Sequence, residues 1–388
     1  MRGGDFMIDI KWLINTMRIL LIFDVLFISA VLIRKIVNYV LVKSKRQFEH
    51  DNLHLIEKCL QTSDISALVD GKHGRISKLV IKEILADKFP SASLVNRFVM
   101  NAIADHFGIY ERDIKQLKSL KWWVQANAAY DLGVFRVKES LPMLIEKLEK
   151  SRNREVRIKA GEAILKISSS RHLLDVMDNI QTLNKRNHNH LIDLIANIEE
   201  DIFPVMEIVL LKSNLLSIRI SIEVLGKKQD ERVLPYAFEC LESGDIEVMI
   251  SALKSLDSLG EISDPEYILP SIMKLKDHKL WVIRSFVAKV LKHYRFPKCY
   301  VVLKDMIGDS SWRVRYNAGI SLATMGSQGV FSLSEILFTP DRFARDMAWQ
   351  LLQKEKLINH LSQFDAEDTV LKQRTLRQMD LYLESQNE

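Results

Sequence analysis

The amino-acid sequence predicts an all-α protein, a solenoid of helix pairs preceded by one transmembrane helix. Three observations support this fold class: an internal repeat of 31 residues, a proline at one fixed place in four repeats, and an apolar stretch near the N-terminus. The repeat is clearest where Trp281–Ile307 is aligned with Trp312–Leu337, which places Arg284 on Arg315. Each unit of such an array packs only on its neighbours, so 388 residues need not divide into globular domains.

The composition agrees with helices joined by short turns, since the chain has only 14 Gly and 8 Pro. Cys59, Cys240 and Cys299 lie far apart in the sequence, so they form neither a disulfide framework nor a clustered zinc site. We expect reduced thiols, no metal and no cofactor.

The net charge of +5 lies entirely in residues 1–46, which hold eight basic and three acidic side chains. The remaining chain has 47 of each sign and is formally neutral. Phosphate backbones attract proteins through a positive field, which a neutral array lacks. We therefore expect no nucleic-acid partner, although a locally basic inner groove remains an alternative.

The stretch Leu13–Ile33 predicts a transmembrane helix, because 21 helical residues match a hydrocarbon core of about 30 Å. A cleaved signal peptide would end in small residues before a polar chain, whereas Arg34 and Lys35 follow at once. An interfacial helix would have one polar face, whereas apolar residues here cover every face. Residues 1–46 are interpreted as a membrane anchor with a basic juxtamembrane segment.

The flanks of this helix predict its orientation. Five basic and no acidic residues lie between Arg34 and Arg46, so the positive-inside rule places the C-terminal side in the cytoplasm of a single-pass protein of the cell membrane. Asp24 lies inside the apolar stretch. An aspartate at the centre of a membrane-spanning helix costs about 2.5 to 3.5 kcal/mol of insertion free energy. It either reaches the outer headgroups beside Arg18 or contacts another membrane helix, which makes it a candidate partner-binding residue.

Residues 47–75 are interpreted as a polar linker with one helical pattern, and residues 76–361 as the repeat array. The first helix of the array begins near Ile76 and ends at Pro90. Ser91 or Ser93 can cap the next helix with its hydroxyl.

The second helix of each pair is predicted by apolar runs spaced 30 to 35 residues apart, which open at Leu141, Leu173, Phe203, Leu234, Leu269, Tyr300 and Phe331. Four of these runs have proline as their second residue, where the first helical turn needs no N–H: Pro142, Pro204, Pro235 and Pro270. The longer interval before Leu269 predicts an inserted loop with the sequence EISDPEY.

The first helices of the pairs are less regular. Small residues such as Ala318 fit places where neighbouring helices approach closely, and four glycines fit left-handed helix ends: Gly133, Gly226, Gly260 and Gly326. The repeat over residues 187–211 keeps the pattern of its second helix, but the pattern of its first helix is degraded, that is, poorly matched to the other first helices. Residues 185–190, KRNHNH, are expected to form a solvated loop because an i,i+2 histidine pair does not share a helix face.

The period, the paired helices, the prolines and a V-R-x-x-A pattern resemble HEAT repeats of the bilin-lyase-like class. The pattern stands at Val156–Ala160 and Val314–Ala318, and the resemblance covers about Ile76–Leu361. The residue patterns of TPR and ankyrin repeats do not recur. In HEAT repeats of this class the arginine pairs with an acidic residue of the turn between repeats. The resemblance therefore implies that Asp309 pairs with Arg315, and Asp277 with Arg284.

Four tryptophans are the other residues considered for partner contact. Trp122 and Trp123 form a doublet that one helix face cannot bury completely, so they are candidates for partner binding. Trp281 and Trp312 occupy equivalent positions and are expected to pack between repeats.

No Gly-rich phosphate loop, nucleophile elbow or H-E-x-x-H motif occurs, so the sequence predicts neither an enzyme nor a small-molecule substrate. The predicted function is a membrane-anchored cytosolic scaffold or adaptor. It would bind another protein on a concave face lined by the second helices. The resemblance to membrane-anchored bacterial HEAT proteins implies a regulator of a membrane enzyme, such as an envelope glycosyltransferase. The alternatives are a HEAT-like lyase or hydroxylase and a nucleic-acid-binding solenoid.

Residues 362–388 predict a C-terminal capping helix and tail, with Asp365 as its N-cap. Five apolar residues are expected to cover the last repeat: Val370, Leu371, Met379, Leu381 and Leu383. A helix that docks a partner is the alternative.

Overall fold

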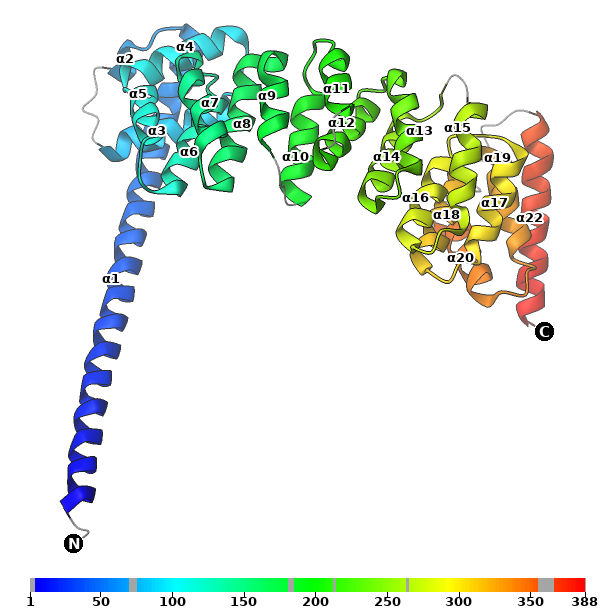
Figure 1. Ribbon diagram of the computed structural model, residues 1–388, viewed down its shortest axis with the longest axis horizontal. Coiled ribbons are helices and arrows are strands. Elements are labelled where there is room, and N and C mark those ends of the chain that lie inside the picture. The colour runs from blue at the N-terminus through cyan, green and yellow to red at the C-terminus, as the bar shows by residue number, and fades with distance from the viewer. Residues whose placement is uncertain are drawn as a thin grey trace. The chain divides into compact units, whose positions relative to one another are not determined.

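The computed structural model describes residues 4–69, 75–180, 185–211, 214–262, 265–354 and 366–387, and every regular element in these ranges is a helix (Figure 1). The predicted all-α class is therefore confirmed. The chain forms two compact units, Met1–Lys147 and Leu148–Glu388, called unit 1 and unit 2 below.

Unit 1 begins with α1 (Gly4–Thr62), an uninterrupted helix that projects from the rest of the unit (Figure 1). Its segment Trp12–Ile36 is long and apolar enough to cross a membrane, and none of its residues is buried. The other end of α1 packs on α3 (Arg75–Lys88) and α4 (Leu94–His106), where Ile56 and Cys59 are fully buried. The helix therefore continues through most of the segment interpreted as a linker, because its apolar face is covered.

The remaining helices of unit 1 are α2 (Ser66–Val69), α5 (Ile109–Gln116), α6 (Trp122–Val134) and the start of α7 (Leu141–Lys150). As predicted, Ser93 caps α4: its hydroxyl accepts a hydrogen bond from the Asn96 N–H at 3.2 Å. The Lys82 ammonium joins three helices, because it lies 2.7 Å from the Asp113 carboxylate and 2.5 Å from that of Asp131. Burial raises the pKa of Asp113 to about 6, although Lys82 opposes the shift.

Unit 2 is a solenoid of helix pairs. Its first helices are α8 (Arg154–Ser168), α10 (Lys185–Ala196), α12 (Leu215–Lys227), α14 (Ile246–Leu259), α16 (Trp281–Leu291), α18 (Trp312–Thr324) and α20 (Arg342–Lys354). Its second helices are α9 (Leu173–Asn179), α11 (Phe203–Leu210), α13 (Leu234–Glu242), α15 (Pro265–Lys274), α17 (Pro297–Ile307) and α19 (Gly326–Ile336). Each first helix packs on the next one along the chain. The core lies between the rows, where Leu225, Ile283 and Leu303 are fully buried.

Four second helices begin at the predicted residue and three begin earlier. Helices α7, α9, α11 and α13 open as expected, whereas α15, α17 and α19 open at Pro265, Pro297 and Gly326. Proline has a helical φ and lacks an N–H, so Pro265 and Pro297 start their helices within segments that show no apolar run. Part of the predicted loop EISDPEY is thus helical, and Pro270 lies inside α15.

Two of the four expected left-handed glycines are confirmed. Gly260 has φ +80° and Gly326 has φ +75°, but Gly133 and Gly226 lie within α6 and α12. Gly226 permits close packing instead: a Cβ there would lie 2.6 Å from the Ser255 Cα on α14. Glycine is required at position 226 because α12 and α14 pack closely there, and not because the helix ends there.

The prediction of a degraded first helix in the repeat over residues 187–211 is wrong, and so is the prediction of a solvated loop at residues 185–190. Helix α10 covers Lys185–Ala196. Its buried face includes His188, Leu191 and Ile195, which pack against neighbouring first helices. The start of this helix is polar in sequence and shows no apolar periodicity, because a histidine, His188, takes the buried position where an apolar residue is usual.

At the C-terminal end, α22 (Ala366–Asn387) packs on α19, the last second helix that the structure describes. Met379 and Tyr382 are buried, and the Ser334 hydroxyl donates a hydrogen bond to the Gln378 side chain. Of the five apolar residues expected to cover the last repeat, three are about half exposed: Val370, Leu381 and Leu383. The expected N-cap, Asp365, lies outside the described residues, and the capping role stays a prediction.

Candidate functional site

The turns between repeats hold arginines in a different pairing from the one that the resemblance implied. Arg284 makes a bidentate contact with Asp309 of the following turn, with N–O distances of 2.6 and 2.8 Å. Arg315 donates instead to the backbone carbonyl of Asp309 at 2.7 Å, and Asp277 contacts Lys276. Both implied pairs are therefore wrong. Burial would raise the pKa of Asp309, but the hydrogen bonds of Arg284 outweigh it and lower that pKa.

A polar cluster around the buried carboxylate of Glu223 joins three first helices and was not predicted. Glu223 on α12 accepts a hydrogen bond from the Ser251 hydroxyl at 2.6 Å and lies 3.1 Å from the Lys254 ammonium. His188 on α10 lies 3.4 Å from the same carboxylate. Burial would raise the pKa of Glu223, but these hydrogen bonds and the Lys254 charge outweigh it and hold that pKa below its usual value. The cluster links α10, α12 and α14 through one buried carboxylate.

The second helices of unit 2 present a row of aromatic residues. Phe203 on α11 lies 6.5 Å from Tyr236 on α13, measured between ring centroids, and Tyr236 donates a hydrogen bond to Glu207 at 2.6 Å. That hydrogen bond raises the pKa of Tyr236. The Arg232 guanidinium lies 4.3 Å from the Phe203 ring centroid, which is within cation–π distance.

The row continues across α13, α15 and α17. The rings of Phe238 and Tyr267 lie 5.3 Å apart. Beyond them, a pocket of about 410 Å³ separates α15 from the start of α17 and is lined by Glu266, Leu269, Pro270, Met273, Phe296, Pro297 and Lys298. Its floor is apolar, while Glu266 and Lys298 place opposite charges on its rim.

This second-helix surface, defined by Phe203, Tyr236, Tyr267, Phe296 and the pocket, is suited to binding. Large apolar side chains remain accessible on it: Tyr267 is 54% exposed, Phe296 37% and Val301 53%. Apolar pockets with a polar rim are typical of protein and ligand contacts. Among the residues that the structure describes, no three His, Cys, Asp or Glu side chains group so that they could hold a metal ion.

The predicted site residues lie apart from this surface. Trp122 and Trp123 begin α6 in unit 1, are 47% and 48% exposed, and contact each other edge to face at 6.0 Å. Asp24 is exposed on the apolar segment of α1. Both assignments stay predictions. The pocket was not predicted, because its lining comes from two repeats; of the lining residues, only Leu269 and Pro270 had been noted in the sequence, as the start of a second helix.

Trp281 and Trp312 do not pack between repeats as expected. They are 37% and 57% exposed at the starts of α16 and α18. The Arg313 guanidinium lies 5.0 Å from the Trp281 ring and 6.0 Å from the Trp312 ring. The equivalent tryptophans therefore form a surface feature.

Comparison with solved structures finds helical repeat proteins. A phycocyanin lyase from Nostoc sp., solved as the complex of CpcE and CpcF, is 17% identical and matches 70% of this chain and 94% of its own, with a TM-score of 0.31. Human deoxyhypusine hydroxylase is 15% identical over 74% of this chain and all of its own, with a TM-score of 0.27. Kap95p, solved with RanGDP, is 10% identical over 87% of this chain and 63% of its own, with a TM-score of 0.39.

The helix pairs themselves define a helical solenoid, so the predicted α-solenoid class is confirmed. The matched structures are also helical solenoids, of the HEAT-repeat type that the sequence resembles. No family model matches the sequence, and no curated protein is similar enough to count as a match.

The prediction that the chain is not an enzyme is corrected by these comparisons. Two of the matched structures, the phycocyanin lyase and the deoxyhypusine hydroxylase, are enzymes. A shared fold hosts catalytic and binding functions alike, and the lack of familiar short motifs does not exclude catalysis. The karyopherins Kap95p and Kap121p, solved with bound proteins, are matched too.

Proposed function

We propose that this chain is a single-pass membrane protein whose solenoid lies in the cytoplasm and binds another protein through the second-helix surface. The observation that carries the proposal is α1, which joins the apolar segment Trp12–Ile36 to the packed core of unit 1 without a break. An apolar helix with no buried residue requires a nonpolar environment, and a bilayer supplies one of the right thickness. We propose a scaffold or regulator of a neighbouring membrane enzyme as its specific role.

The length of α1 sets the distance between the proposed membrane segment and the packed part of unit 1. Ile56 is the first fully buried residue after Ile36 that the structure describes. At 1.5 Å per residue, the intervening helix spans about 30 Å. If α1 stands upright, the packed part of unit 1 is held beyond the lipid headgroups.

The orientation predicts the behaviour of two fusions. A reporter that is active only in the cytoplasm should be active after Glu388 and inactive before Met1, because the basic residues between Arg34 and Arg46 favour the cytoplasmic side. Activity of both fusions would show that α1 does not cross the membrane. The reverse pattern would show that the solenoid lies outside.

The binding surface is tested by photo-crosslinking in intact membranes. A photoreactive phenylalanine at Tyr267 on α15 should form adducts with another protein, because this side chain is 54% exposed beside the pocket. The matched control places the same group at Ser258, which is exposed on the first helix α14. Equal adducts at both positions, or none at Tyr267, would contradict binding by the second-helix surface.

A further inference from the structure

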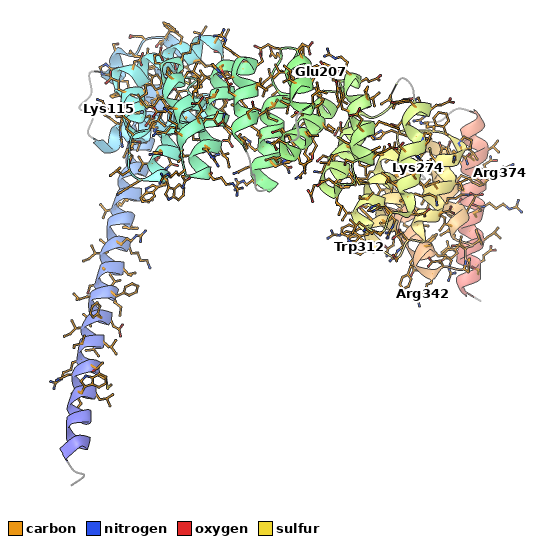
Figure 2. The ribbon with its side chains drawn as sticks, viewed as in Figure 1. Lys115, Glu207, Lys274, Trp312, Arg342 and Arg374 are labelled. Atoms are coloured by element: carbon orange, nitrogen blue, oxygen red, sulfur yellow. The ribbon has the colours of Figure 1, made fainter. Side chains whose placement is uncertain are left out.

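A second surface in unit 2 lies at the starts of three consecutive first helices. Trp281, Trp312 and Phe343 follow one another at intervals of 31 residues and are 37%, 57% and 67% exposed. We call this row, together with Arg313 and Arg342, the aromatic ladder. Helix α16 packs on α18 and α18 on α20, so the row is continuous across the three pairs. Trp312 and Arg342 project outward from the same edge of the unit (Figure 2).

Cationic side chains lie between the rings of the ladder. The Arg313 guanidinium is within 5.0 Å of the Trp281 ring and 6.0 Å of the Trp312 ring, so it bridges two repeats. Arg315 lies 5.4 Å from the Phe343 ring, and Tyr316 lies 6.1 Å from Trp312. An arginine that stacks on an aromatic ring keeps its charge and restricts the orientation of the ring.

The charge of the ladder is positive. Arg313 is exposed and Arg342 is 82% exposed. With Arg315, three arginines lie at the ladder against the carboxylates of Asp341 and Asp346. Asp309 is paired with Arg284, and Asp341 accepts the Phe343 N–H at 2.9 Å as the cap of α20. Asp346 lies 3.8 Å from Arg342, but exposed pairs of this kind contribute little. The ladder therefore favours a ligand with negative charge.

The spacing of the ladder selects a linear ligand. Packed helices have axes about 8 to 10 Å apart, which sets the distance between successive rings. A polyproline II helix has three residues per turn and rises 3.1 Å per residue, about 9 Å per turn. Every third residue of such a peptide would meet one ring, and the residues between them would meet Arg313 and Arg342. Aromatic grooves bind polyproline II segments in this way because little conformational entropy is lost.

We propose that the aromatic ladder binds a proline-rich acidic segment of another protein, with prolines at every third position against Trp281, Trp312 and Phe343. Trp281, Trp312 and Phe343 come one from each successive first helix, and this linear order fits a peptide better than a lipid surface. The prolines of this chain lie at least five residues apart, so the ligand does not come from the same sequence. This surface is separate from the second-helix surface and does not depend on it.

The test uses the full chain in nanodiscs of zwitterionic lipid and a fluorescein-labelled peptide of repeating Pro-Glu-Asp. Fluorescence anisotropy should show saturable binding that weakens with salt. Trp312→Ala and Arg313→Ala should each weaken it at least tenfold. Phe98→Ala, which removes an exposed aromatic from α4, should leave it unchanged. Circular dichroism melting verifies that each variant is folded, and a Gly-Glu-Asp peptide of equal charge should bind at least tenfold more weakly.

Three results would overturn the proposal. Equal binding of the Gly-Glu-Asp peptide would mean that charge alone acts, and unchanged binding by Trp312→Ala would place the peptide elsewhere. Absence of peptide binding, with Trp312-dependent capture of the nanodiscs by phosphatidylserine vesicles, would make the ladder a lipid-binding surface.

Discussion

Gly226→Ala is expected to lower the free energy of unfolding of unit 2 by about 3 kcal/mol, at the upper end of typical overpacking costs. A Cβ at this position would lie 2.6 Å from the Ser255 Cα and 2.7 Å from its carbonyl oxygen. These are backbone atoms of α14, so the clash is relieved only if α12 and α14 move apart. That movement would also strain the contact between Glu223 and Lys254, which joins the same two helices.

Gly319→Ala is the matched control. Gly319 also lies inside a first helix, but the atom nearest to its added Cβ is Cδ1 of Leu351, the end of a flexible side chain. Alanine favours a helix interior by up to about 1 kcal/mol over glycine, which offsets part of the adjustment. Urea unfolding followed by circular dichroism should separate the two variants by at least 2 kcal/mol. Equal effects would mean that α12 and α14 separate at little cost.

Ala318→Arg is expected to destabilise the last repeats by several kcal/mol, because Ala318 is fully buried on α18 and an arginine there would be an unpaired buried charge. Thr324→Arg is the control, since Thr324 is exposed at the C-terminal end of the same helix. There a cation interacts favourably with the helix dipole. The melting temperature should fall for the first variant and stay nearly constant for the second.

Hydrogen exchange shows how far this damage spreads. A solenoid couples mainly nearest neighbours, so amide exchange in Ala318→Arg should quicken over α16 to α20 and remain unchanged in α3 to α6. Uniform acceleration from Ile76 onward would instead indicate one cooperative core, and it would contradict the repeat interpretation.

Local sequence signals were sufficient for the fold class and for many helix starts. Ser93 caps α4 as predicted because a serine hydroxyl accepts the N–H of a residue only three positions away. Four second helices open where an apolar run was expected, since the residues that define the start are neighbours in the chain. The apolar segment near the N-terminus was likewise evident from consecutive residues, although the continuation of its helix to Thr62 was not.

The tertiary structure decided which residues meet between repeats. Asp309, in the turn between α17 and α18, pairs with Arg284 on α16 and not with Arg315. Helix packing brings the Arg284 Nε to 2.6 Å from the Asp309 carboxylate. His188 appeared to belong to a polar loop but is buried beside Glu223, 35 residues away. Trp281 and Trp312 appeared to be packing residues but lie outside on the ladder. Periodicity specifies a residue's place in its own helix, whereas burial and pairing depend on distances between helices that only packing sets.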